Sequence, residues 1–245
     1  MDYLKSEHLK FKRTISNKLI FIVPLITAIF AWIMGGYMGY QYMTLYWWYA
    51  FLLPGAIAIL CSLSHRKEEN AGKYYSVFSM PVNLSRFEFA KGIILVEKLL
   101  VSAIFLALLI SISNIIAPAT AVYSLLHSIT GSIGIILASV WQIPLCLYLA
   151  RKTGMFVPIV LNTILGIVLS TATALGNTIA WWFVPYCWAS VSRSRRKEPL
   201  MGIEMNGTYA GNCGFSIAIM ISISLSILLF LILSYADAKD FSKGR

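Results

Sequence analysis

Six long apolar stretches separated by short polar segments dominate the pattern along this chain. They cover residues 19–38, 46–64, 92–116, 126–149, 155–176 and 215–235. A helix of about 20 apolar residues crosses the hydrocarbon core of a bilayer, where backbone polar groups must be satisfied within the segment. The pattern therefore predicts an all-α membrane protein with six transmembrane helices, forming one membrane domain over residues 1–245.

Composition agrees with a membrane protein. Of the 245 residues, 58% are hydrophobic and 12% are charged, and the mean hydropathy is +0.75. A soluble domain carries about 25% charged residues, so this chain has too few to cover a surface that faces water. The net charge of +10 comes from basic residues beside the apolar stretches, without the aromatic stacking positions of a nucleic-acid interface.

The positions of the basic residues predict the orientation. Segments 1–18 and 65–91 are rich in Lys and Arg, whereas segments 39–45 and 117–125 contain neither. Basic residues favour the cytoplasmic side, so both termini are expected there, with the first stretch a retained span.

One cluster, residues 193–197, is basic but falls outside in this topology. A seven-span alternative would place it inside, at the cost of moving the basic C-terminus outside.

The cytoplasmic segment 65–91 has a defined internal pattern. Charged residues followed by apolar ones at helical spacing predict a short amphipathic helix on the membrane surface. Pro81 ends it, and Ser85 with Glu88 forms a capping box that starts the next long helix. The segment is either an interfacial anchor or an element that receives force from a soluble partner. The candidate coupling residues are Arg66, Lys67, Glu68, Glu69, Tyr74, Phe78, Pro81, Ser85 and Glu88.

Two further segments are expected at the membrane surface. Residues 1–18 predict an interfacial helix. The outer segment 177–213, between the fifth and sixth spans, is rich in aromatic residues, which prefer the headgroup level. It forms either an aromatic belt or a surface that touches an amphipathic substrate. The residues of that candidate surface are Trp181, Trp182, Phe183, Tyr186 and Trp188.

The sequence contains no visible catalytic or metal-binding constellation. The middles of the six stretches hold no ionisable residue, which disfavours a proton-coupled transporter. The three histidines lack the spacing of metal ligands, and no G-x-x-x-x-G-K-[ST] loop is present to bind phosphates. We therefore expect no enzymatic activity and no cofactor bound by this chain. If the protein moves a substrate uphill, the energy must come from another chain.

Cysteines and small residues indicate packing. Cys61 and Cys146 fall within apolar stretches and are expected to be small packing residues. Cys187 and Cys213 both fall near the outer face, either as a disulfide or as two thiols. Small residues recur four apart at Gly166 with residues 170 and 174, a spacing that lets helices approach closely.

Several short motifs resemble the permease subunits of lantibiotic-immunity ABC transporters. They are the segment 5–14 before the first span, Trp47-Trp48 with Leu53-Pro54-Gly55, and Arg66-Lys67-Glu68-Glu69-Asn70 followed by Ser79-Met80-Pro81-Val82 and Lys91. The resemblance extends over the whole chain in length and span count and is closest to the MutE/EpiE type, with the sister MutG type an alternative.

This resemblance implies an ABC type-2 exporter permease architecture, with a cytoplasmic coupling helix and a re-entrant outer segment between spans five and six. It further implies a separate ATP-binding subunit that uses the ATP, a second related permease, contact with membrane lipid, a location in the bacterial plasma membrane, and export of a lantibiotic peptide for self-immunity. The outer basic cluster departs from this picture, because it would repel a cationic peptide. A non-transporting membrane scaffold is the main alternative, ahead of a membrane-embedded enzyme.

Overall fold

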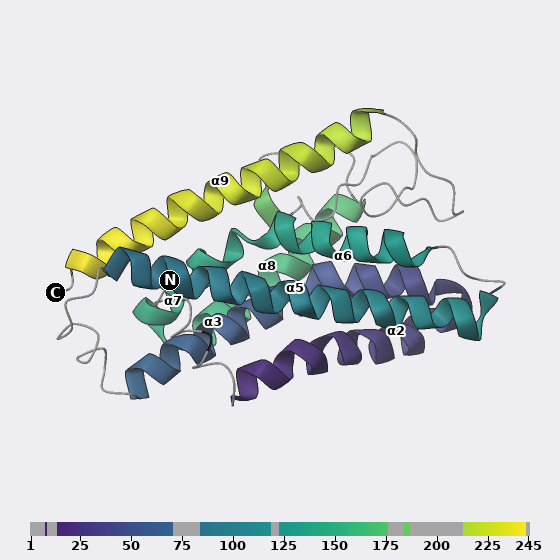
Figure 1. Cartoon of the computed structure of the whole chain (residues 1–245), viewed down its shortest axis with the longest axis horizontal. Coiled ribbons are helices and arrows are strands. Elements are labelled where there is room, and N and C mark those ends of the chain that lie inside the picture. The colour runs from purple at the N-terminus through teal and green to yellow at the C-terminus, as the bar shows by residue number, and fades with distance from the viewer. Residues whose placement is uncertain are drawn as a thin grey trace.

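The computed structural model describes residues 8, 14–70, 84–118, 123–175, 184–186 and 213–243, which form a bundle of long helices (Figure 1). In chain order the elements are α2 (Ile15–Trp47), the π-helical turn η1 (Trp48–Leu52), α3 (Leu53–Asn70), α5 (Leu84–Ile116), α6 (Leu125–Ser139), α7 (Gln142–Thr153), α8 (Phe156–Leu175) and α9 (Cys213–Lys243). No strand occurs in these ranges, so the described chain is all-helical, as predicted.

The helices have the length and composition of membrane spans. Three stretches are long and apolar enough to cross a bilayer, namely Ile15–Asn70, Arg86–Ile116 and Met220–Asp240. The pair α6 and α7 passes the same test as one bent span, which makes four among the described residues. The apolar part of α8, Phe156–Ser170, is shorter.

The first of these stretches is a hairpin, because the chain reverses at Gly36. This residue has φ 53° and ψ −154°, a conformation that is essentially confined to glycine. The ring centroids of Phe30 and Trp47 lie 4.9 Å apart. A continuous helix, rising 1.5 Å per residue, would separate these two residues by about 25 Å. The loop expected at 39–45 is therefore wrong, since the helix resumes immediately after the glycine.

Three prolines lie just after interruptions of regular helix, where a missing N–H removes fewer hydrogen bonds than in a helix interior. Pro54 follows the π-helical turn η1, and Pro144 follows a bend of 45° between α6 and α7. Pro158 is the third residue of α8. The single span expected at 126–149 is thus two helices, and the proline explains where it breaks.

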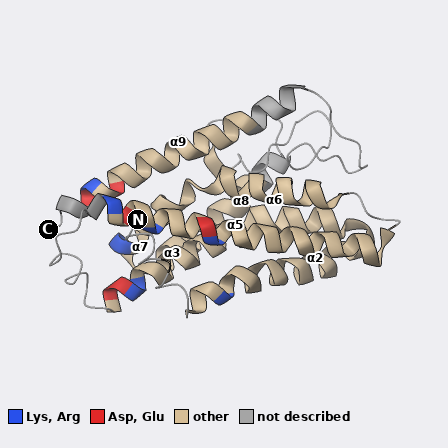
Figure 2. Ribbon diagram, viewed as in Figure 1, with Lys and Arg blue, Asp and Glu red and all other residues tan. Residues whose placement is uncertain are grey.

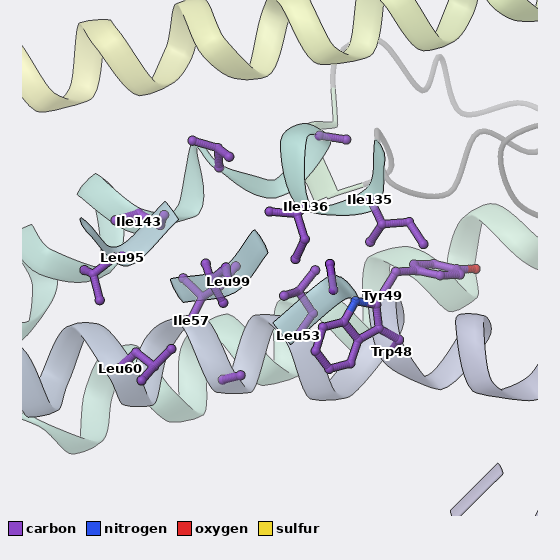
Figure 3. Close-up of a cluster of buried hydrophobic side chains, with 14 of the residues drawn as sticks. Trp48, Tyr49, Leu53, Ile57, Leu60, Leu95, Leu99, Ile135, Ile136 and Ile143 are labelled. Carbon is purple, nitrogen blue, oxygen red and sulfur yellow. The ribbon is translucent and has the colours of Figure 1, made fainter. Parts of the chain in front are cut away.

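The core lies where η1 and α3 meet α5, α6 and α7 (Figure 3). Its fully buried side chains include Trp48, Leu53, Ile57, Leu95, Leu99, Ile135, Ile136 and Ile143. Small residues such as Ala103 and Ala107 on α5 are also fully buried, which brings neighbouring backbones close together. Cys61 and Cys146 lie in this core as buried thiols, which confirms their predicted packing role.

A hydrogen-bonded group of side chains ties the hairpin to α5 and α6 at the end of the bundle near Gly36. Gln41 Nε2 donates to Asn114 Oδ1 (2.6 Å), and Gln41 Oε1 accepts from the backbone N–H of Tyr123 (2.9 Å). Asn114 Nδ2 donates to the carbonyl of Tyr123 (2.9 Å). These bonds satisfy the backbone N–H and carbonyl of Tyr123, which precedes α6 and has no place in a helical ladder.

Replacement of Gly36 by alanine should destabilise the hairpin. A Cβ at this position meets nothing within 4 Å, so the cost is backbone strain alone, about 1–3 kcal/mol. The unfolding free energy in detergent micelles measures it. Gly39→Ala is the control, because Gly39 is helical and a Cβ there makes only an ordinary contact with Met43 at 3.8 Å. Equal stability of the two variants would contradict a reversal at Gly36.

Candidate functional site

Charged side chains gather in the half of the bundle toward one end (Figure 2). Every Lys, Arg, Asp and Glu whose side chain is described lies there, near the start of α2, the end of α3, in the first half of α5 and near the ends of α7 and α9. Charges are costly in hydrocarbon, so this distribution places one end of the bundle at a polar boundary. We call it the charged end.

The last turns of α3 carry the first four candidate coupling residues. Arg66 and Glu69 are exposed, Lys67 is half-buried and Glu68 is buried. These residues continue the membrane helix directly and do not start a separate surface helix. The turn between α7 and α8 supports them, since Ser62 Oγ donates to the carbonyl of Met155 (3.2 Å) and Arg66 Nη1 lies 3.8 Å from Met155 Sδ.

Other predicted residues of this segment lie outside the described part of the chain or lack a described side chain. Tyr74, Phe78 and Pro81 fall in the range 71–83, about which the structure says nothing. Helix α5 begins at Leu84, so Ser85, the expected N-cap, is already inside the helix. This shift of one residue is within the usual variation of helix boundaries.

A buried group of four charged side chains joins α5, α7 and α9 at the charged end. We call it the ion cluster; its members are Glu88, Lys91, Arg151 and Asp237. Glu88 Oε1 lies 3.2 Å from Lys91 Nζ and 3.6 Å from Arg151 Nη1. Arg151 Nη2 donates to Asp237 Oδ1. The side chain of Lys91 is 1% exposed and that of Glu88 is 4% exposed.

The ion cluster holds two positive and two negative charges, so its formal charge is zero. Withdrawing an ion from water costs several kcal/mol, which only well-placed partners recover. The planar guanidinium of Arg151 reaches two carboxylates from two different helices, a geometry that the single ammonium of lysine does not offer. The cluster therefore specifies how three helix ends sit together, and adds little net stability over an apolar contact.

The sequence pattern misassigned one member of the ion cluster and missed two. The capping-box interpretation placed Glu88 on the coupling surface, whereas its carboxylate is buried inside the bundle. Arg151 served only to predict orientation, and Asp237 was not considered. The signal in the sequence was the position of Asp237, two residues after the apolar stretch 215–235. An aspartate that becomes buried at the end of an apolar helix requires a cation from a neighbouring helix.

The outer aromatic segment is described only at 184–186, so Trp181, Trp182, Phe183 and Trp188 lie outside the described residues. Tyr186 does not form an outer surface. Its hydroxyl donates to Asn162 Oδ1 (2.5 Å), and its ring packs edge-on against Trp141 with centroids 4.9 Å apart. Burial raises the pKa of the Tyr186 hydroxyl, so it remains a neutral donor. This residue was expected either in an aromatic belt or on a surface that touches substrate; in the structure it is half-buried and packs against the core.

The segment 1–18 is described at His8 and from Thr14 onward. His8 Nδ1 lies 3.5 Å from Glu97 Oε1, so this part of the chain touches α5 in the charged half of the bundle. Among the described side chains, no group of three or more His, Cys, Asp and Glu residues is placed to hold a metal ion. What the charged end does provide is a connection between α5, α7 and α9 through the ion cluster.

Replacement of Arg151 by leucine should strongly destabilise the bundle. Glu88 and Asp237 would lose their shared cation while remaining buried, which costs about 3–5 kcal/mol. The unfolding free energy in detergent micelles measures the effect. The adjacent Lys152 is the control, because its pair with Asp240 is half-exposed on both sides and such pairs contribute about 0–1 kcal/mol. If Arg151→Leu and Lys152→Leu cost the same, the ion cluster does not hold the helix ends.

Comparison with known proteins gives one match. The model of a family described as ABC-2 family transporter protein matches residues 3–169, which is more than half of the chain and includes α2 through most of α8. Searches of curated proteins and of solved structures give no match.

Proposed function

This chain belongs to the ABC-2 family of transporter proteins, and from that premise we propose that it is the permease subunit of an ATP-driven exporter. The observation that carries the proposal is the charged end, where α3, α7 and α9 finish and α5 begins, and where the ion cluster connects three of these helices. A movement imposed on one helix end there would reach the others. No phosphate-binding loop occurs in the sequence, so a separate ATP-binding subunit would supply that movement.

We propose six membrane crossings with both termini in the cytosol. The reversal at Gly36 divides the stretch 15–70 into two antiparallel arms, and α5, the bent pair α6–α7, α8 and α9 supply four more segments. The charged end would face the cytosol, as the excess of basic residues favours. The bacterial plasma membrane is the location that the family resemblance suggests.

The cytosolic partner is proposed to contact the last turn of α3 and the segment that follows it, within residues 65–91. Arg66 and Glu69 present opposite charges to solvent at this point. The first turns of α5 carry Glu88 and Lys91 into the ion cluster at the same end of the bundle (Figure 2). Force from an ATPase at this surface would therefore act at the end where the helices are connected.

The substrate is proposed to be a lantibiotic or a similar amphipathic peptide, exported from the membrane to protect the producing cell. Support comes from the motifs at 66–70 and 79–82 and around Pro54, and the family assignment is compatible with it. A second, related permease would complete the transporter as a heterodimer. The alternative, a membrane scaffold without transport activity, predicts that loss of this chain leaves peptide sensitivity unchanged.

The double variant Arg66→Glu, Glu69→Arg should abolish co-purification of the ATP-binding subunit. The exchange keeps the net charge and the helix while reversing the pattern that a partner would recognise. The control is Lys152→Asp with Asp240→Lys, an exchange at the same end of the bundle but on α7 and α9. Pull-down of the ATPase from detergent extracts measures both. If the α3 variant still binds the ATPase, the coupling surface does not lie at Arg66 and Glu69.

Deletion of this chain, with the neighbouring transporter subunits retained, should lower the lantibiotic concentration that stops growth. Clearance of peptide from the membrane would cease, while the response to a small non-peptide antibiotic should not change. Growth inhibition by both compounds, with complementation by the wild-type chain, measures the effect. Unaltered lantibiotic sensitivity would favour the scaffold alternative.

A further inference from the structure

Two irregular stretches of backbone meet in the interior of the bundle. The second arm of the hairpin passes through the π-helical turn η1 before Pro54, and the chain bends by 45° between α6 and α7 just before Gln142. Regular helix is interrupted at both places, so the relative position of the flanking helices depends on contacts with neighbouring segments.

Helix α8 lies directly against the first of these breaks. A Cβ on Gly166 would come within 2.9 Å of the carbonyl oxygen of Ala50 in η1 and within 2.8 Å of Pro54 Cγ. Only a glycine permits this approach, which brings Asn162, one turn earlier on α8, up to the break. The Asn162 Nδ2 group donates to the carbonyl of Pro54 at 2.7 Å.

The same amide also reaches the second break. Asn162 Nδ2 donates to Gln142 Oε1 (3.1 Å) at the start of α7, and Asn162 Oδ1 accepts from the Tyr186 hydroxyl (2.5 Å). Asn162 is 1% exposed, and both N–H bonds and the carbonyl oxygen of its amide are used. Each bond goes to a different segment of the chain. By contrast, the buried Thr27 bonds within its own helix, to the carbonyl of Val23 at 2.8 Å.

We infer that Asn162 is a positioning residue that pins the two helix breaks together, so that α3 and α7 move as one unit between the breaks and the charged end. Between the breaks and the charged end, α3 and α7 are in direct contact, with Cys61 Sγ 3.6 Å from the carbonyl oxygen of Ile143. At the charged end, α3 carries the exposed Arg66 and α7 carries Arg151 of the ion cluster. Movement at the proposed coupling surface would thus be delivered to the bundle interior without separating these helices. This consequence for transport rests on the proposed function, whereas the pin itself does not.

Two native thiols report whether the unit stays closed. Cys61 on α3 and Cys146 on α7 are both fully buried, and each follows its break along the chain. With Cys187 and Cys213 replaced by serine, the reaction of the two remaining thiols with N-ethylmaleimide measures local opening between the helices. The measurement uses the full chain in liposomes and resolves the two labelled peptides by mass spectrometry.

In Asn162→Leu, which keeps the branched shape of the side chain but removes three hydrogen bonds to other segments, both thiols should react about tenfold faster or more. Tyr186→Phe removes one of these bonds with little change of shape and should give a smaller increase; it also keeps the test valid if Asn162→Leu fails to fold. Gln142→Leu added to Asn162→Leu should have no further effect, because the two share one bond. Thr27→Val, which removes a buried bond within one helix, is the control and should leave both rates unchanged.

The outcomes separate this inference from the proposed function. Wild-type labelling rates in Asn162→Leu and in Tyr186→Phe would overturn the pin, whatever the chain transports. If the thiols respond as expected, ATP hydrolysis and lantibiotic export by the reconstituted complex are compared next. The pinned unit predicts that Tyr186→Phe lowers the peptide exported per ATP hydrolysed, with binding of the ATPase retained. A wild-type complex that exports no lantibiotic would refute the proposed function and leave the labelling result standing.

Discussion

The requirement that polar backbone groups find partners inside the chain governs this bundle. Within the apolar interior, an uninterrupted helix meets this requirement by itself, and most of the chain is built in that way. The informative places are those where the helix is interrupted, at Gly36, at η1 before Pro54, and at the bend before Gln142. Near the first of these, Gln41 and Asn114 bond to each other and to the backbone of Tyr123. At the other two, a single amide on α8 bonds to the carbonyl of Pro54 and to the side chain of Gln142.

The same low-dielectric interior explains the distribution of charge. Lys, Arg, Asp and Glu side chains of the described residues lie in the half of the bundle toward the charged end, and four of them form the neutral ion cluster. A buried ion cluster adds little net stability, but it penalises any arrangement in which one member loses its partner. Helix ends held in this way keep a defined relation to one another, which is what a transporter driven from one side requires.

The ion cluster and the Asn162 bonds lie at the two ends of one mechanical path. Arg151 stands near the end of α7, and Gln142 stands at its start, so this short helix connects the charged end to the bundle interior. Helix α3 runs beside it, from Pro54 to the exposed Arg66. The chain belongs to a transporter family. In the proposed function, this path would carry movement from the charged end to the interior of the bundle.

The sequence by itself determined the elements that depend on local pattern. Apolar stretches of sufficient length predicted an all-helical membrane protein, and Cys61 and Cys146 were correctly expected in the packing. Resemblance in short motifs pointed to the transporter family, which the match over residues 3–169 confirms at the level of that family. These features follow from hydrophobicity and from shared ancestry, both of which act along the chain.

Only the tertiary structure decided which residues meet. The loop expected at 39–45 is a helix, because one glycine with positive φ is enough to reverse the chain. Glu88 has the spacing of a capping residue, yet it is buried beside Arg151, which is 63 positions away in the sequence. Tyr186 belongs to an aromatic run typical of a membrane interface, yet it bonds to Asn162 inside the bundle. Partners of this kind lie on different helices, and their pairing depends on how the helices pack, which no periodicity along the chain encodes.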